Sequence, residues 1–339
     1  MFLTGTASLD IKAGAPNRAG ASERDTIMSG VKTTRIGRGV YPYVSAQALR
    51  RWLRDTMTSN GFAPSPVTRS GSGEKQKIST AARGDLYADD DVFGYMLAGK
   101  GGATVQRDTV LATGTFVSVR PQQPTRDLGV MARGLQPGEH PARFDHDHYT
   151  TQLAGDLRLD MARIGRFEMD GDRCPDLSAA ARDEASQAGA VDTTFRGNTT
   201  VELPLEQRRE RVAGLLRALA ELDGGATVNM HYGNRTPAFV LLAPMACGAN
   251  PFTRVLRDSN GDTEFDTAVF DEQMSAWEDR IAGPVFIGWE PGFLGEQRDH
   301  VAQHLQQRYG ETVQLAHPRT VLRQLAGDIE TGKHDEWFT

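Results

Sequence analysis

Residues 17–54 read NRAGASERDTIMSGVKTTRIGRGVYPYVSAQALRRWLR and join a long polar loop to an amphipathic helix. Ser45 is a favoured N-cap residue, and Val44 and Leu49 stand at the two positions of a hydrophobic staple. Beyond this cap, two sets of residues recur at helical spacing, one on each side of the helix. The apolar set is Leu49, Trp52, Leu53 and Thr56, and the polar set is Gln47, Arg50, Arg51 and Arg54. We therefore expect one face to pack in the core and the other to form a polar fork.

Positive charge is concentrated in this stretch. It contains eight Lys and Arg residues and two acidic residues, so its charge is about +6, whereas the whole chain carries −6. A basic segment on an otherwise acidic protein is the electrostatic footprint of a binder of phosphate backbones. A solvated helix face after a flexible loop would give the same pattern, so charge alone leaves both interpretations open.

The order of motifs in this stretch adds a family resemblance. A first strand, an Asn/Arg-containing loop, a Lys-Thr pair, a Gly-rich turn and an aromatic-Val-Ser-x-Gln helix follow one another. This order resembles the amino-terminal signature of the CRISPR type I effector-complex (Cascade) backbone subunit, the Cas-seven family of DevR type (type I-B-like) in the RAMP superfamily. The matching residues are Arg24-Asp25, Lys32-Thr33, Arg38, Ser45, Gln47, Arg50, Arg51 and Arg54.

The resemblance implies an α+β fold, an RRM-like (ferredoxin-like) palm with a finger-like insertion and a long thumb hairpin. Residues 1–56, 103–120 and 149–339 would form the palm with helical additions, residues 57–102 the finger and residues 121–148 the thumb. The residues themselves give the order β, α, insertion, β, hairpin, β, α, β, β, α, β, α, which is consistent with such a palm.

The resemblance also implies a function. The chain would bind guide RNA (crRNA) through sequence-independent backbone contacts, oligomerise head to tail along it and present it for pairing with target DNA. Other effector-complex subunits and a recruited nuclease or other effector would be further partners. RNA contacts are expected from Arg24, Lys32, Arg38, Ser45, Gln47, Arg50, Arg51 and Arg54, and from Arg126, Arg133 and Arg143 on the thumb. No catalytic residue, metal or cofactor is expected.

Aromatic residues support recognition through phosphate and sugar. An ordinary RRM stacks bases on aromatic side chains of its sheet. Here the expected strands within 103–119 and 226–245 offer only Phe116, Tyr232 and Phe239, and the basic and aromatic RNP pattern is absent. Contacts to phosphate and sugar fix a strand in place without reading its sequence, which suits a holder of arbitrary guides.

Composition predicts a cytoplasmic protein that does not enter a membrane. The chain has 339 residues, 39% of them hydrophobic, with a mean hydropathy of −0.45. It has no run of eighteen apolar residues, and its start lacks the basic and apolar regions of a signal peptide. Cys174 and Cys247 are too far apart in unrelated contexts to indicate a disulfide framework or a metal site.

Two other classes of function stay open. A guide-processing ribonuclease of the same superfamily would need a histidine-centred acid/base site, and only His231 and the pair His146 and His148 are candidates. On an extended chain His146 and His148 share one face while Asp145 and Asp147 share the other, so one site cannot easily gather all four. A small-molecule αβ enzyme is disfavoured because the sequence has no nucleotide fingerprint or catalytic triad pattern.

Further elements follow from local pattern. Asp89, Asp90 and Asp91 are expected to cap a helix rather than bind metal. Residues 103–120 predict one long strand or a strand pair, and residues 168–200 a surface excursion. Residues 203–223 predict a helix whose arginines at 208, 209 and 211 face solvent or a partner, with strands at 227–230 and 238–245 after it.

Overall fold

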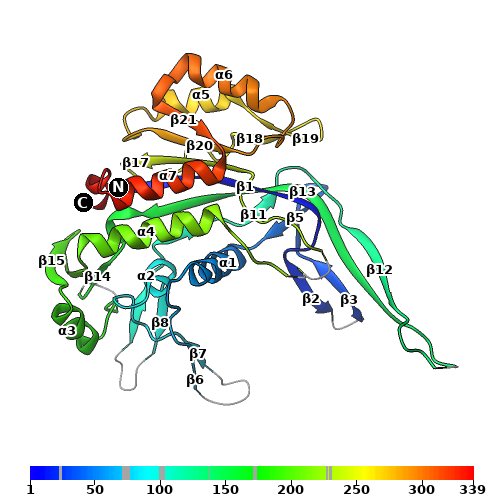
Figure 1. Ribbon diagram of the computed structural model, residues 1–339, viewed down its shortest axis with the longest axis horizontal. Coiled ribbons are helices and arrows are strands. Elements are labelled where there is room, and N and C mark those ends of the chain that lie inside the picture. The colour runs from blue at the N-terminus through cyan, green and yellow to red at the C-terminus, as the bar shows by residue number, and fades with distance from the viewer. Residues whose placement is uncertain are drawn as a thin grey trace.

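The computed structural model describes residues 1–22, 25–70, 77–98, 104–136, 138–170, 174–226, 228 and 231–339, with the backbone alone for 20–22, 25–29, 70 and 77. It is a mixed α/β structure built on one large central sheet, with helices on both sides (Figure 1). No helix of these described ranges is long and apolar enough to cross a membrane.

The central sheet has the strand order β21-β20-β17-β1-β13-β11-β5-β4, and β10 also pairs with β13. Neighbours along this order run antiparallel, except that β20 and β21 are parallel. The strands are β1 (Phe2–Gly14), β4 (Thr33–Ile36), β5 (Gly39–Val44), β10 (Leu111–Thr113), β11 (Phe116–Ser118), β13 (Ala142–Asp160), β17 (Phe239–Met245), β20 (Val285–Trp289) and β21 (Val313–Ala316).

Two apolar cores lie on opposite faces of this sheet. On one face Leu3, Leu9 and Ile11 of β1 pack with α1 (Ala46–Ser59), α4 (Leu205–Ala220) and α7 (Pro318–Glu330). On the other face Phe239 and Trp289 pack with α5 (Thr267–Ala276), α6 (Gln297–Tyr309) and the hairpin of β18 (Leu256–Ser259) and β19 (Asp262–Phe265). Both sets of helices are visible in Figure 1. The alternation of side chains along a strand explains how β17 serves both cores.

The helix after the basic loop forms as predicted. Ser45 is the N-cap of α1, and its hydroxyl accepts a hydrogen bond from the backbone N–H of Ala48 at 3.4 Å. The predicted apolar stripe of Leu49, Trp52, Leu53 and Thr56 is buried. The helix ends at Ser59 with Asn60 as its C-cap, and Gly61 follows with a φ of +102°, the left-handed conformation that glycine adopts without strain. Burial of each large apolar side chain of the stripe contributes about 1.5–3 kcal/mol.

A long hairpin projects from the sheet at the end away from the chain termini (Figure 1). It joins β12 (Thr125–Met131) to the first part of β13, a strand of 19 residues whose later part lies between β1 and β10 or β11. Asp127 pairs with His146 across the hairpin, and Thr125 pairs with His148. The hairpin occupies most of the range predicted for a thumb, while the division into palm, finger and thumb stays a prediction.

Shorter elements surround the sheet. Strand β3 (Asp25–Val31) pairs with β2 (Arg18–Ser22) and runs parallel to β13 at Asp145 and His146. The segment between α1 and β10 contains β6 (Thr68–Ser70), β7 (Lys77–Ser79), α2 (Ala88–Phe93), β8 (Tyr95–Leu97) and β9 (Val105–Arg107). Single turns of 3₁₀ helix occur at Met161–Arg163, Gly310–Thr312 and Asp335–Phe338.

Three local predictions were wrong or incomplete. The long strand or strand pair expected at 103–120 is divided into the three short strands β9, β10 and β11. The excursion expected at 168–200 instead contains α3 (Ala179–Gln187) and a sheet of β14 (Arg166–Glu168), β16 (Asn198–Glu202) and β15 (Val191–Phe195), which together enclose the buried Phe167. The strand expected at 238–245 is β17, but most of the range 227–230 lies outside the described residues.

Candidate nucleic-acid interface

The basic loop before α1 is held in place by backbone and amide hydrogen bonds. The N–H of Lys32 donates to the carbonyl of Asn17 at 3.1 Å, and the N–H of Tyr43 donates to the carbonyl of Lys32 at 3.1 Å. The side-chain amide of Asn17 donates to the carbonyl of Tyr43 at 2.7 Å. The start of β2, the segment before β4 and the end of β5 are therefore fixed together next to the helix N-terminus.

Cationic side chains of this loop are open to a ligand. Arg18, Arg35 and Arg38 are exposed, and Lys32 is half-buried. Within the part of the chain that the structure describes, no carboxylate forms an ion pair with any of these four cations. Arg24, which the resemblance also marks as an RNA contact, lies outside the described residues.

The polar face of α1 is divided between open and engaged residues. Gln47 is exposed, and the Nη1 of Arg50 donates to the hydroxyl of Thr113, at 3.2 Å. Arg51, also exposed, forms an ion pair with Asp55 with Nε and Oδ2 2.6 Å apart. Nε of Arg54 lies 3.3 Å from Oδ2 of Asp89, and its guanidinium carbon lies 4.9 Å from the ring centroid of Phe93.

The fork predicted on this face is therefore only partly available. Gln47 and Arg50 present unused donors next to the basic loop. Arg51 holds a carboxylate in an exposed pair, which contributes little and is easily exchanged. Arg54 is only 29% exposed and links α1 to α2 through Asp89 and Phe93, so its contacts are those of a residue that holds two elements together.

The hairpin arginines lie at different distances from the sheet. Arg126 is near the hairpin base, where its Nε lies 3.7 Å from Oδ1 of Asp147 on the paired strand. Arg143 pairs with Val130 further out, and Arg133 lies beyond the end of β12. Both Arg133 and Arg143 are exposed, as are the apolar side chains of Leu128 and Met131 on the same hairpin.

Three histidines meet at the base of the hairpin, and sequence reasoning had not brought them together. The ring centroid of His231 lies 4.8 Å from that of His146 and 5.5 Å from that of His148. Nε2 of His146 lies 3.3 Å from Oδ2 of Asp127. The predicted shared face of His146 and His148 is confirmed, because both rings contact His231. We call His146, His148 and His231 the histidine cluster.

The histidine cluster has unsatisfied polar atoms. Nδ1 of His146, Nδ1 of His148 and Nε2 of His231 are all inaccessible to solvent and have no hydrogen-bond partner among the described residues. Burial lowers the pKa of His231, and the neighbouring rings of His146 and His148 lower it further, while Asp127 opposes them. In the described part of the chain, no group of histidine, cysteine or acidic side chains has a geometry that could hold a metal ion.

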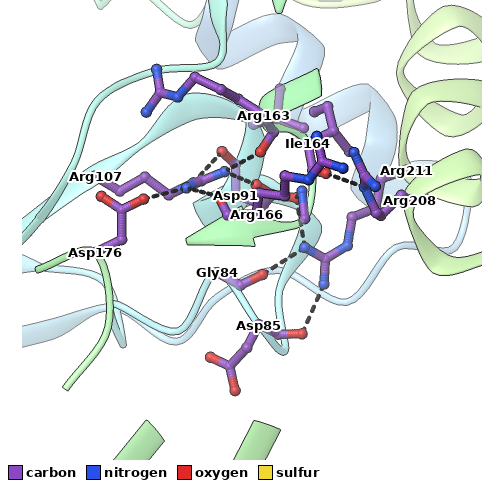
Figure 2. Close-up of polar contacts among 12 residues, drawn as sticks. Gly84, Asp85, Asp91, Arg107, Arg163, Ile164, Arg166, Asp176, Arg208 and Arg211 are labelled. Carbon is purple, nitrogen blue, oxygen red and sulfur yellow. Dashed lines mark hydrogen bonds and ion pairs between the residues drawn. The ribbon is translucent and has the colours of Figure 1, made fainter. Parts of the chain in front are cut away.

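A second polar cluster is fully buried and centres on Arg107, on β9 (Figure 2). Its guanidinium donates to the carboxylate and carbonyl of Asp91, to Oδ2 of Asp176 at 2.6 Å, and to the carbonyls of Arg163 and Arg166 at 3.0 and 2.9 Å. Every N–H of the side chain is thereby used. Both Arg107 and Asp91 have side chains that are 0% exposed.

Two arginines of α4 join the same cluster, although the sequence predicted them to face solvent or a partner. Arg211 donates to Oδ2 of Asp91 at 2.6 Å and to the carbonyls of Gly84 and Asp85. Arg208 donates to the carbonyl of Ile164 at 2.7 Å and pairs with Glu202. We call Arg107, Arg208 and Arg211 with their carboxylates the arginine network (Figure 2).

The aspartates before Phe93 belong to this buried polar region. Asp89, Asp90 and Asp91 lie in the first turn of α2, as predicted, but they do not cap it. Asp89 and Asp90 accept hydrogen bonds from Ser65, and Asp91 accepts them from Arg107, Arg211 and the N–H of Gly165. The capping prediction was wrong because arginines and loop N–H groups distant in sequence take the carboxylates first. The cluster is a structural junction in which Arg107 has no donor left for a ligand.

Comparison with known proteins identifies the fold. A chain of a solved CRISPR RNA-guided surveillance complex is 13% identical, with a TM-score of 0.54 over 96% of this chain and 99% of that one. A chain of such a complex in a pre-nicking state is 11% identical, with a TM-score of 0.59 over 97% of this chain and 100% of that one. No protein-family model matches the sequence, and no curated protein does either. The chain therefore shares the mixed α/β fold of surveillance-complex chains along nearly its whole length.

Proposed function

We propose that this chain is a scaffold protein that binds single-stranded RNA along its sugar-phosphate backbone. More particularly, we propose that it is the guide-RNA-binding backbone subunit of a CRISPR type I effector complex of the Cascade kind, of DevR type. The observation that carries the proposal is the fold similarity to surveillance-complex chains over 96% or more of both partners in each comparison. The basic loop and the open donors of α1 support it independently.

The topology supports an RRM-like palm. Taken in chain order, β1, α1, β10 with β11, β13, α4 and β17 form a β-α-β-β-α-β unit. Its strands lie in the order β17-β1-β13-β10 or β11, with all neighbours antiparallel. We assign this unit as the palm, residues 57–102 as the finger-like insertion and the hairpin within residues 121–148 as the thumb.

In the proposed mechanism, cations and amide groups grip phosphate and ribose and leave the bases unread. Lys32, Arg38, Gln47 and Arg50 make the contacts, with Ser45 at the positive N-terminus of α1. Arg51 exchanges its exposed partner Asp55 for a phosphate. Copies assemble head to tail, and such packing is open-ended, so the guide RNA and other subunits set its length. The chain catalyses nothing itself, and a recruited nuclease or other effector acts on the paired target DNA.

The test replaces two open cations and compares them with a matched pair. Arg38→Ala with Arg50→Ala removes two charges from the proposed interface, whereas Arg254→Ala with Arg280→Ala removes two exposed charges from the carboxyl-terminal part. Binding of labelled single-stranded RNAs of unrelated sequence is measured over a range of salt concentrations. The first variant should weaken binding to all sequences alike and reduce the slope of log affinity against log salt by about 0.7 per lost contact. Equal behaviour of the two variants would refute the interface.

The histidine cluster gives a second candidate function, the guide-processing ribonuclease. In that reaction one imidazole would accept the proton of a ribose 2′-hydroxyl as it attacks the neighbouring phosphorus. A second imidazole would donate a proton to the departing 5′-oxygen, which leaves a 2′,3′-cyclic phosphate. Incubation of precursor RNA with the protein in the presence of a chelator tests this candidate. Intact RNA on a denaturing gel after long incubation would eliminate it.

A further inference from the structure

The histidine cluster lies next to the basic loop. Strand β3 pairs with β13 at His146 and ends immediately before Lys32, and Arg18 begins the partner strand β2. A strand of RNA that crosses Lys32 and Arg38 would therefore pass close to the base of the projecting hairpin. The charge of Arg18 also contributes to the lowered pKa of His231.

The hydrogen bonding of the cluster is incomplete among the residues that the structure describes. More than nine-tenths of buried polar groups in proteins have a partner, and an unmet one is costly. Here three ring nitrogens, from two separate chain segments, have no partner among the described residues, and His146 is only 7% exposed. The arginine network, by contrast, has satisfied comparable groups from within the protein. No described residue meets these nitrogens, so we look beyond the described residues for a partner, which would reach them once the rings turn.

The hydrogen-bond donors of the cluster suit an anionic partner. Among the described side chains, the charged groups that face it are Asp127 from β12 and Arg18 from β2. Asp127 engages Nε2 of His146 alone. Asp147 pairs with Arg126 and does not compete. Imidazole N–H groups and a guanidinium are donors, and a phosphate oxygen is the acceptor that such a set recognises.

We propose that His146, His148 and His231 form a binding site for one phosphodiester of the RNA backbone, and that the site takes up a proton when it binds. This inference rests on the proposed function and adds a site to it at the hairpin base. Without RNA, neighbouring rings and partial burial disfavour the protonated form of His231. A phosphate in contact with the rings reverses this preference because it stabilises the imidazolium.

The sign of the pH dependence follows from linkage. The bound state has the higher histidine pKa, so it holds more protons than the free state at neutral pH. RNA affinity should therefore rise as the pH falls through the pKa of the bound state and should level off below the pKa of the free state. Each proton taken up corresponds to a change of about tenfold in affinity per pH unit within that window.

The experiment measures fluorescence anisotropy of a labelled, unstructured RNA between pH 5.5 and pH 8 at constant ionic strength. The proteins are the full chain, the triple variant H146Q, H148Q, H231Q, the single variant His231→Gln, and the control His300→Gln, an exposed histidine of α6. The full chain and the control should gain affinity as the pH falls, and the triple variant should bind with a nearly constant affinity. Thermal melting checks that each variant is folded.

Histidine titration by NMR provides a measurement that needs no substitution. Addition of RNA should raise the pKa of at least one cluster imidazole, and inorganic phosphate should do so more weakly. An unchanged pH dependence in a folded triple variant, or unchanged imidazole pKa values on saturation with RNA, would overturn the inference while RNA binding itself stands. Absence of RNA binding at every pH would overturn the proposed function and the inference with it. Histidine-dependent cleavage of the RNA would replace the binding site by a catalytic one.

Discussion

The arginine network and the histidine cluster are both polar, both partly or fully buried, and opposite in how their hydrogen bonds are met. Arg107 uses all its donors on groups of the same chain, including Asp91 and Asp176. The histidine cluster has three ring nitrogens that no described residue meets. Titratable groups alone would mark both regions as candidate sites.

The difference is that the side chain of Arg107 has all its hydrogen bonds met by described residues, whereas each histidine of the cluster has a buried nitrogen without a described partner. Buried ions persist when partners and hydrogen bonds complete their shells, and breaking such a set leaves an uncompensated charge. Buried polar groups that lack some of their hydrogen bonds are destabilising unless another group supplies the missing partners. The arginine network therefore joins the insertion to α4, and the histidine cluster is the place to look for a ligand.

The largest expected effect comes from breaking the arginine network. Asp91→Asn removes the negative charge that Arg107 and Arg211 share, and it leaves two buried guanidinium groups with one buried carboxylate partner fewer. The free energy of unfolding should fall by about 3–5 kcal/mol, the range for a broken buried pair. Urea denaturation measures it. Asp279→Asn, at an exposed pair with Arg280, is the control, and an equal loss in both variants would contradict the structural role.

A smaller effect is expected at Arg54, which is partly buried and contacts Asp89 and Phe93. Arg54→Met keeps most of the apolar stem but removes the ion pair with Asp89 and the contact with the ring of Phe93. The loss should be about 1 kcal/mol in a denaturation experiment. RNA affinity should change less than in Arg50→Ala. If RNA binding collapsed while stability stayed constant, Arg54 would be an RNA contact as the sequence predicted.

Stability should also depend on pH through His231. Its folded pKa is lowered by burial and by the neighbouring rings, so the unfolded chain binds a proton more readily. Folding stability should therefore be fully present above the ordinary histidine pKa of about 6.5 and should decrease as the pH falls through it. Urea midpoints at several pH values should show a weaker decrease in His231→Gln. His300→Gln should follow the full chain, and a slope unchanged in both would contradict the prediction.

The smallest effect is expected at the exposed pair of Arg51 and Asp55. Their side chains are 70% and 52% exposed, so water and salt screen the attraction. Arg51→Gln should lower the free energy of unfolding by about 0.3–0.5 kcal/mol, the value typical of such helical pairs. Thermal denaturation at low and high salt measures it. A loss that approached that of Asp91→Asn would show that exposure does not separate these pairs.

The sequence predicted those features that residues close together in the chain determine. Helix α1 was predictable because Ser45, the spacing of Leu49 and Trp52, and Gly61 all act within a few residues. The facing pair of His146 and His148 follows from the alternation of a strand. The strand or strand pair expected at 103–120 is interrupted, and the pairing with β13 shifts by one residue between Thr113, opposite Leu157, and Val117, opposite Ala154. The register is set by another strand, so a linear pattern cannot show it.

Long-range partners account for the rest. Arg211 and Asp91 are 120 residues apart in the chain, so the period of α4 could not show that this arginine faces inward. His231 reaches the other two histidines only because the sheet returns its segment to the hairpin base. The helical spacing placed Arg54 on the polar face with Arg50 and Arg51, and it could not show the ion pair with Asp89. The spacing of residues predicts which side chains share a face of a helix or strand. The residues that this face contacts are seen only in the folded structure.

The length of β13 has a mechanical consequence. Its 19 residues span roughly 60 Å, and one continuous strand serves both the sheet and the projection. The inner part of β13 is hydrogen-bonded to neighbouring strands on both edges. The twist of the sheet therefore sets the direction in which the hairpin projects. Two residues added to each arm would lengthen its reach by about 7 Å and keep every side chain on its own face, whereas a single residue would invert the faces beyond it. Natural variation in reach should therefore come in even steps.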